Sequence, residues 1–144
     1  MSSTGSFPSP AARQEQAVGA ERLEHADIRG SLILAPRAVA VGEDLSLKLE
    51  LVNAGRAAGK LIKVEELVPS HFEMVAPPGL YEVEENSIIL KGKRLDPLKT
   101  EQVHVVIKAV ARGVFTLKPR IMYLDESGNY KSHEPEPVEV KVAG

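Results

Sequence analysis

Cysteine and tryptophan are absent from this sequence, and aromatic residues make up only 4% of it. Without cysteine, the chain has no disulfide, no thiolate ligand for a metal and no thiol nucleophile. That absence does not fix the compartment: it fits a cytosolic protein, and it equally fits a surface protein that folds without disulfides. The few aromatic residues are scattered along the chain, so they form no row of rings on which nucleic-acid bases could stack.

An excess of one charge and long apolar runs are missing as well. The 18 basic and 20 acidic residues give a net charge of −2, so no surplus of positive charge attracts nucleic acid or an anionic membrane. No run approaches the roughly 18 apolar residues of a membrane span, and residues 1–10 lack the basic and apolar regions of a signal peptide. We therefore expect no nucleic-acid or membrane partner. We expect a cytoplasmic location for the chain as given, or an extracellular one if it is part of a larger surface protein.

Aliphatic side chains supply most of the hydrophobic share of 43%, and their clearest pattern lies in residues 44–53. Apolar and polar residues alternate there, which is the period of a strand with one buried face. Gly42 and Asn53-Ala54-Gly55 are turn residues on either side. The buried face of this leucine stripe consists of Leu45, Leu47, Leu49 and Leu51. A second stripe has the same period, and we expect it to face the first across a sandwich; it consists of Val103, Val105 and Ile107.

Period-two segments continue from Ile28 to the end of the chain, separated by turn residues about every 8–12 positions. No helical pattern lies between them, which favours an antiparallel sandwich of about seven to eight strands over a βαβ fold. Pro36 and Pro119 interrupt two of the segments. This predicts that the segment at Pro36 lies at a sheet edge, and that residues 114–124 lie at an edge or bend at Pro119. The alternation slips once within residues 60–68, where we expect a β-bulge.

Residues 1–27 differ from the rest. The first ten are rich in Ser, Pro and Gly, and residues 11–27 are rich in Ala, Gln, Glu and Arg, with Gly19 as an interruption. A short polar helix of this kind is marginal in water. We therefore interpret residues 1–27 as a disordered or weakly helical leader and residues 28–144 as one β-sandwich domain. The alternative is that the leader is the end of a longer helix that joins the domain to something upstream or packs on a partner.

No set of residues predicts a reaction. The four histidines fall in separate segments without metal-ligand spacing. Two groups of glutamates, at residues 65–66 and 82–85, offer carboxylate pairs of the kind that glycosidases use, but the exposed face of a strand explains them better. Residues 125–129 carry closely spaced oxygen ligands without the twelve-residue pattern of a calcium loop. A phosphate-binding glycine loop and a Gly-x-Ser-x-Gly elbow are both missing. We expect no catalytic residue, no cofactor and no metal.

Four segments nevertheless resemble prokaryotic Ig-like modules. Residues 39–55 are similar to their V-x-V-G-E…V-x-N-x-G opening, and residues 64–75 to their V-x-D-x-L-P-x-G-F segment. Residues 95–101 are similar to L-x-P-G-E, and residues 112–119 to R-G-x-Y-x-L-x-P. This order is found in CARDB domains, in the conserved-repeat domains of surface proteins and in BatD-like proteins. The resemblance covers residues 31–142 and implies an Ig-like sandwich that serves as a spacer, scaffold or binding accessory, without catalytic residues.

We therefore expect a non-catalytic Ig-like module that mediates protein–protein contacts through a sheet face or an open edge. Its protein partner is unidentified, and homo-oligomer formation stays open. The alternative is a cell-surface stalk or adhesion module that binds glycan or calcium; an enzyme is the least favoured reading. The two segments broken by proline are the predicted partner edge, with Arg37, Val39, Val41, Val114, Thr116 and Lys118 as its residues.

Overall fold

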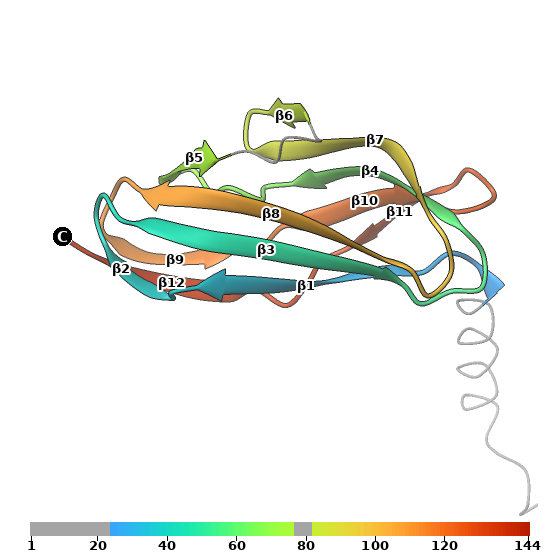
Figure 1. The fold of residues 1–144 in the computed structure, drawn as a ribbon, viewed down its shortest axis with the longest axis horizontal. Coiled ribbons are helices and arrows are strands. Elements are labelled where there is room, and N and C mark those ends of the chain that lie inside the picture. The colour runs from blue at the N-terminus through green and yellow to red at the C-terminus, as the bar shows by residue number, and fades with distance from the viewer. Residues whose placement is uncertain (1–23, 77–81) are drawn as a thin grey trace, which may run out of the picture.

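Twelve strands make up the fold in the computed structural model, which describes residues 24–76 and 82–144 (Figure 1). The strands are β1 Ile28–Ala35, β2 Ala38–Ala40, β3 Asp44–Asn53, β4 Gly59–Glu65, β5 Phe72–Ala76, β6 Glu82–Glu84, β7 Ser87–Leu95, β8 Thr100–Ala109, β9 Gly113–Leu117, β10 Arg120–Leu124, β11 Tyr130–His133 and β12 Val138–Ala143. Within these residues, no helix has the length and apolarity needed to cross a membrane.

Two layers pack face to face. The first layer is the antiparallel sheet β1-β3-β8-β5. The second contains the sheet β11-β10-β4-β7-β6 and the smaller sheet β2-β12-β9, and only the β2–β12 pair in it is parallel. Strand β1 belongs to the first layer and β2 to the second, so the chain changes layer at Pro36. This confirms the predicted all-β, Ig-like antiparallel sandwich.

One long hairpin joins the two sheets of the second layer. Strand β9 pairs with β12 and β10 pairs with β11, so the chain 113–124 runs antiparallel to the chain 130–143 throughout. Pro119 separates β9 from β10, and Pro135 and Pro137 separate β11 from β12. Proline has no N–H to donate to a ladder, so each break falls where the sequence predicts it. These breaks explain why the structure has twelve strands where seven to eight were expected.

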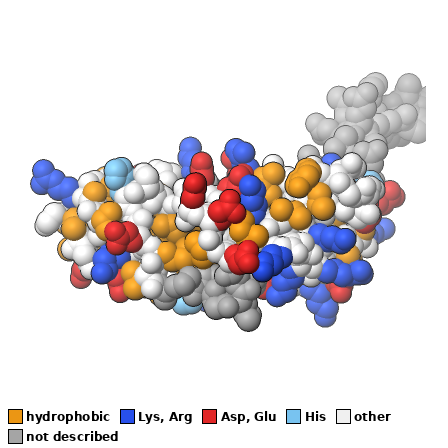
Figure 2. Space-filling model, turned by 90° about the horizontal axis from the view of Figure 1, so that it is seen from above, with side chains coloured by type: hydrophobic (Ala, Val, Ile, Leu, Met, Phe, Trp, Pro, Cys, Tyr) orange, Lys and Arg blue, Asp and Glu red, His pale blue; other side chains and the backbone are white. Residues whose placement is uncertain are grey.

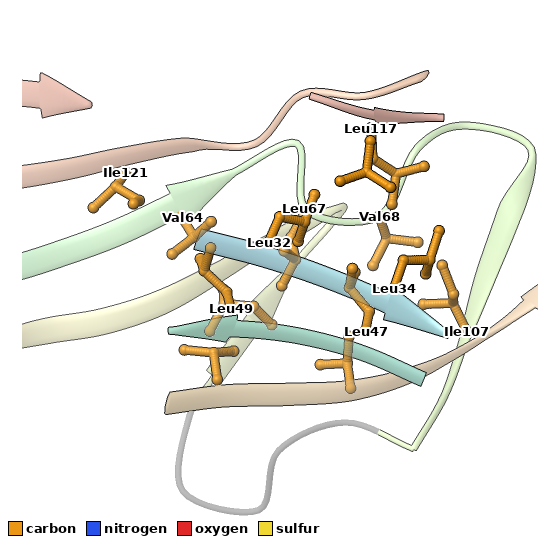
Figure 3. Packing of buried hydrophobic residues seen from close by; sticks show 14 of the residues in the cluster. Leu32, Leu34, Leu47, Leu49, Val64, Leu67, Val68, Ile107, Leu117 and Ile121 are labelled. Atoms are coloured by element: carbon orange, nitrogen blue, oxygen red, sulfur yellow. The ribbon is translucent and has the colours of Figure 1, made fainter. Parts of the chain in front are cut away.

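The core lies between the layers. Leu49 of β3 lies toward Val64 of the second layer (Figure 3), and Leu47 and Ile121 belong to the same buried cluster. All four leucines of the stripe are at most 1% exposed. The approach of the layers is close, because a Cβ built on Gly30 would lie only 2.4 Å from the Cδ1 atom of Ile121.

The predicted placement of the two stripes was wrong in one respect. They do not face each other across the core, because β3 and β8 are neighbours in the same sheet, with Leu47 opposite Val105 and Leu49 opposite Val103. Both stripes line the same face of the first layer. Periodicity indicates which side chains are buried, but it carries no information about which strand lies next to which.

Other local predictions are confirmed. Strand β4 has a register irregularity between Leu61 and Lys63, at the slip in its alternation. His104 lies on the exposed face of β8, where its Nε2 atom is 2.7 Å from the Ser46 hydroxyl oxygen. The predicted leader falls mainly on residues 1–23, which lie outside the described residues.

Candidate interaction surface

Strand β9 has an open outer edge. Its neighbour β12 also pairs with β2: the Lys141 N–H donates to the Arg37 carbonyl, and the Val41 N–H donates to the Ala143 carbonyl, each at 2.8 Å. Residues 141 and 143 therefore direct their backbone groups toward β2, and residues 138, 140 and 142 direct theirs toward β9. On β9, Leu117 lies opposite Val138, Phe115 opposite Val140 and Gly113 opposite Val142.

The intervening residues of β9 point the other way. By the alternation of a ladder, the N–H and C=O groups of Val114 and Thr116 face away from β12. No described residue supplies a hydrogen-bond partner for these groups. The Val114 side chain is 61% exposed. Two of the predicted edge residues, Val114 and Thr116, thus present free main-chain groups, and Lys118 is exposed just beyond them.

The predicted edge at β2 is different. Arg37 and Val41 give their backbone groups to β12, and Val39 lies between them with its side chain only 8% exposed. The outward groups belong to Ala38 and Ala40. Those of Ala40 are occupied, because its N–H donates to the Glu43 carboxylate (2.6 Å) and its carbonyl accepts from the Glu43 N–H (3.1 Å). The turn after β2 therefore blocks most of this edge.

Strand β9 lacks an outer neighbour because β4 ends early. The ladder between β4 and β10 stops where Glu65 lies opposite Arg120. The next residue, Glu66, has a positive φ of 56°, and there the chain leaves the line of the strand. Leu67 and Val68 then enter the core, where Val68 and Leu117 are neighbours (Figure 3). No described strand pairs with β9 at the position that a longer β4 would fill.

A polar cavity of about 420 Å³ lies where β4 ends. Its walls come from the end of β4, from the β6–β7 turn and from the link between β9 and β10. Acidic and basic side chains gather over the middle of this face, seen from above in Figure 2. The charged residues that line the cavity are Lys63, Glu65, Glu66, Glu84, Glu85, Lys118, Arg120 and Glu134.

The two groups of glutamates were interpreted separately from the sequence, as exposed strand residues. The structure brings them together, because Glu66 and Glu85 line the same cavity. The Leu67 N–H donates to the Asn86 carbonyl at 3.0 Å, which ties the end of β4 to the β6–β7 turn. This juxtaposition could not be read from the sequence, since the two segments are some 20 positions apart and nothing local indicates that they meet.

A second cluster closes the opposite end of the sandwich. The Glu126 carboxylate bonds the His25 Nδ1 atom and accepts a hydrogen bond from the Ala26 N–H at 2.9 Å. Asp125 is buried, and its Oδ1 atom accepts from the Ser127 and Asn129 N–H groups, so the predicted calcium-like loop is held by its own amides. His25, Asp125 and Glu126 offer three possible ligand atoms within 4.8 Å of one another. Their existing bonds explain why these side chains lie together. The bonds from Glu126 to His25 and Ala26 hold residues 25–26 against the β10–β11 loop, and we call this contact the latch.

The latch should depend on pH. The hydrogen bond and charge of Glu126 raise the pKa of His25, and the bond to His25 lowers the pKa of Glu126 to about 2. The Glu126 contribution is present above its usual pKa of 4.5 and is lost as the pH falls toward 2. The His25 contribution is present below its usual pKa of 6.5 and is lost as the pH rises through the raised value. The latch is therefore strongest between these two usual values.

We expect NMR titration of the imidazole Cε1–H signals to separate two histidines. His25 should titrate above 6.5, and Glu126→Gln should return its pKa toward that value, while Glu136→Gln, a remote exposed control, should leave it unchanged. His133 should titrate below 6.5, because burial lowers its pKa and its Nδ1 atom accepts the Gly30 N–H at 3.2 Å. A His25 signal unaffected by Glu126→Gln would contradict the latch.

The comparisons with known proteins concern the fold. No protein-family model matches the chain, and no curated protein matches its sequence. The major pilin subunit BcpA of Bacillus cereus is similar in structure, with a TM-score of 0.62 and 9% identity over 82% of this chain and 41% of the pilin. A non-cellulosomal cohesin from the archaeon Archaeoglobus fulgidus has a TM-score of 0.50 and 16% identity over 81% of this chain and 92% of the cohesin. The chain spans about two fifths of the pilin. The chain is an Ig-like β-sandwich module.

Proposed function

We propose that this Ig-like module is a non-catalytic interaction domain that binds another protein chain by adding one of its strands to β9. The observation that carries the proposal is the outward-facing main chain of Val114 and Thr116, for which the described residues supply no partner. An extended segment from another chain would complete these hydrogen bonds, a mode of recognition known as β-augmentation. Each such bond contributes about 0.5–1.5 kcal/mol, so several in a row make a stable contact.

Partial protection of two other edges supports this choice. Exposed edges promote unwanted association, and proteins usually protect them. Glu43 occupies the outward groups of Ala40 on β2, and His133 accepts the Gly30 N–H on β1. On β9, neither Val114 nor Thr116 has such a partner among the described residues, and a partner strand would supply it. A pilin subunit and a cohesin share this fold, which is compatible with an interaction or adhesion module, and the finer resemblance to CARDB-like and BatD-like domains belongs to this proposal as well.

Proline substitutions on the two edges test the proposal. Thr116→Pro removes an N–H that points away from the sheet, so the ladder with β12 keeps its hydrogen bonds. Ala38→Pro makes the same change at the outer edge of β2. We expect both variants to fold, and we expect Thr116→Pro alone to lose the partner that wild type retains when purified from its native cells. The measurement is quantitative mass spectrometry of co-purified proteins, followed by titration with the purified partner. Equal retention by Thr116→Pro and wild type would refute the role of β9.

A further inference from the structure

The cavity lies next to the place that an added strand would occupy. Lys118 and Arg120 of its lining directly follow β9 in the sequence, and Glu66 lies where β4 turns away. A strand that pairs with Val114 and Thr116 would run in line with β4, and one of its ends would reach the mouth of the cavity. Whatever pairs with β9 therefore also meets the charges of this lining.

Those charges favour a cation. Three basic and five acidic side chains line the cavity, which gives a net charge of −2. Two of the basic groups already have partners, since Lys63 pairs with Glu65 at 3.2 Å and Arg120 with Glu134 at 3.5 Å. The remaining carboxylates belong to Glu66, Glu84 and Glu85, and among the described residues they have no ion pair. Only Lys118 remains to offset them.

The cavity wall is also held in a defined shape. Glu66 and Glu85 both have positive φ, 56° and 55°, a region that residues with a Cβ rarely adopt. The Asn86 carbonyl accepts from both the Leu67 and Val68 N–H groups, which fixes the two turns against each other. The carboxylates are thus presented by preorganised turns, and such rigidity lowers the entropic cost of binding.

The chain itself carries a segment that fits. Arg112 precedes β9, is exposed, and has no ion-pair partner in the described part of the chain. If two β9 strands pair antiparallel with Val114 opposite Thr116 of the second copy, the outward N–H and C=O of each residue are each satisfied once, and the symmetric contact makes four hydrogen bonds. Directly opposite β-branched residues are favourable neighbours in a sheet. This register places Arg112 of the second copy opposite Lys118, a like charge, at the mouth of the cavity, where the Glu66, Glu84 and Glu85 carboxylates offset the repulsion.

Resting on the proposed function of β9, we propose that the strand added there is β9 of a second copy of this chain. The two copies form a twofold-symmetric dimer in which the second layer of one sandwich continues into that of the other. Each copy places its Arg112 guanidinium at the Glu66, Glu84 and Glu85 carboxylates of the other. Because the contact is isologous, every favourable pair occurs twice.

A charge exchange tests this dimer with the full chain. Sedimentation velocity from micromolar to millimolar concentration should show a wild-type dimer. Arg112→Glu and the double variant Glu66→Lys/Glu85→Lys should each raise the dimer Kd by about tenfold or more, since two symmetric contacts become repulsive. Combining all three substitutions should restore the wild-type Kd. Arg37→Glu, an exposed charge reversal on the β2 side, is the control and should leave the Kd unchanged.

The outcomes separate this inference from the proposed function. A wild-type chain that stays monomeric at millimolar concentration would overturn the dimer, as would a triple variant that fails to recover. In either case the proposed function still stands if Thr116→Pro abolishes binding of a different protein. A dimer that persists unchanged in Thr116→Pro would also overturn this inference, because association would then not use β9, whereas the proposed function falls only if Thr116→Pro retains a protein partner as well as wild type does.

Discussion

Leu49→Asp is expected to unfold the domain. Leu49 is fully buried in the middle of β3, between Leu32 of β1 and Val103 of β8. The substitution removes the packing of a core leucine, which is worth about 2–5 kcal/mol, and places a carboxyl group where no polar partner exists. The combined loss exceeds about 5 kcal/mol, which is comparable with the whole stability of a domain of this size.

Circular dichroism and thermal melting measure this effect. Wild type should melt in one cooperative transition, and Leu49→Asp should have no such transition. Ser46→Asp is the matched control, because it adds the same group to the exposed face of the same strand and should change stability by less than about 1 kcal/mol. A soluble Leu49→Asp protein that melts cooperatively would contradict the central position of the stripe in the core.

The leucine stripe also marks what local pattern can and cannot predict. Alternation alone identified the buried side of β3. Its four leucines, Leu45, Leu47, Leu49 and Leu51, are all at most 1% exposed. The same alternation placed the valine stripe in the wrong layer, because β8 is a neighbour of β3 and not its opposite. Strand neighbours are set by the whole-chain fit of turns and packing, and one strand contains little information about them.

The position of the predicted partner edge could be predicted from local sequence, but which of its residues are free to pair with another chain could not. Pro36 and Pro119 cannot donate to a ladder, and β1, β2 and β9 beside them lie at sheet edges. Strand β10, which follows Pro119, does not, because it lies between β11 and β4. Which residues point outward depends on the register with β12, a pairing between residues some 25 to 100 positions apart. The cap that Glu43 places on Ala40 is also visible only in three dimensions. The sequence therefore predicted both edges, while the structure separates the blocked one from the open one.

The last prediction concerns Asn53, which the sequence indicated only as a turn residue. Its side chain is fully buried and makes four hydrogen bonds at the end of the sandwich. The Oδ1 atom accepts from the N–H groups of Asp27 (3.1 Å) and Gly55 (2.9 Å). The Nδ2 atom donates to the carbonyls of Ala57 (2.8 Å) and Leu95 (2.9 Å). One amide thus joins the start of β1, the turn after β3 and the end of β7.

Asn53→Ala should lower the free energy of unfolding by about 3–5 kcal/mol, because it removes a fully buried amide and the hydrogen bonds it makes to four backbone groups. Chemical denaturation measures the loss, and Asn129→Ala, at an exposed asparagine, should cost less than about 0.5 kcal/mol. A loss below about 1 kcal/mol for Asn53→Ala would show that water replaces the amide and that Asn53 does not organise this end of the fold.

Asn53→Asp should make the loss of stability depend on pH, which a simple loss of packing would not do. The shape is kept, but an oxygen now faces the carbonyls of Ala57 and Leu95, so the ionised form is repelled and the pKa of the new carboxyl should rise. A protonated carboxyl can donate to one of these carbonyls. The variant should therefore lose stability relative to wild type as the pH rises above about 4, the usual pKa of an aspartate, and regain part of it below that pH. Denaturation curves at acid and neutral pH that keep the same difference from wild type would contradict the role of Nδ2 as the donor that joins these two carbonyls.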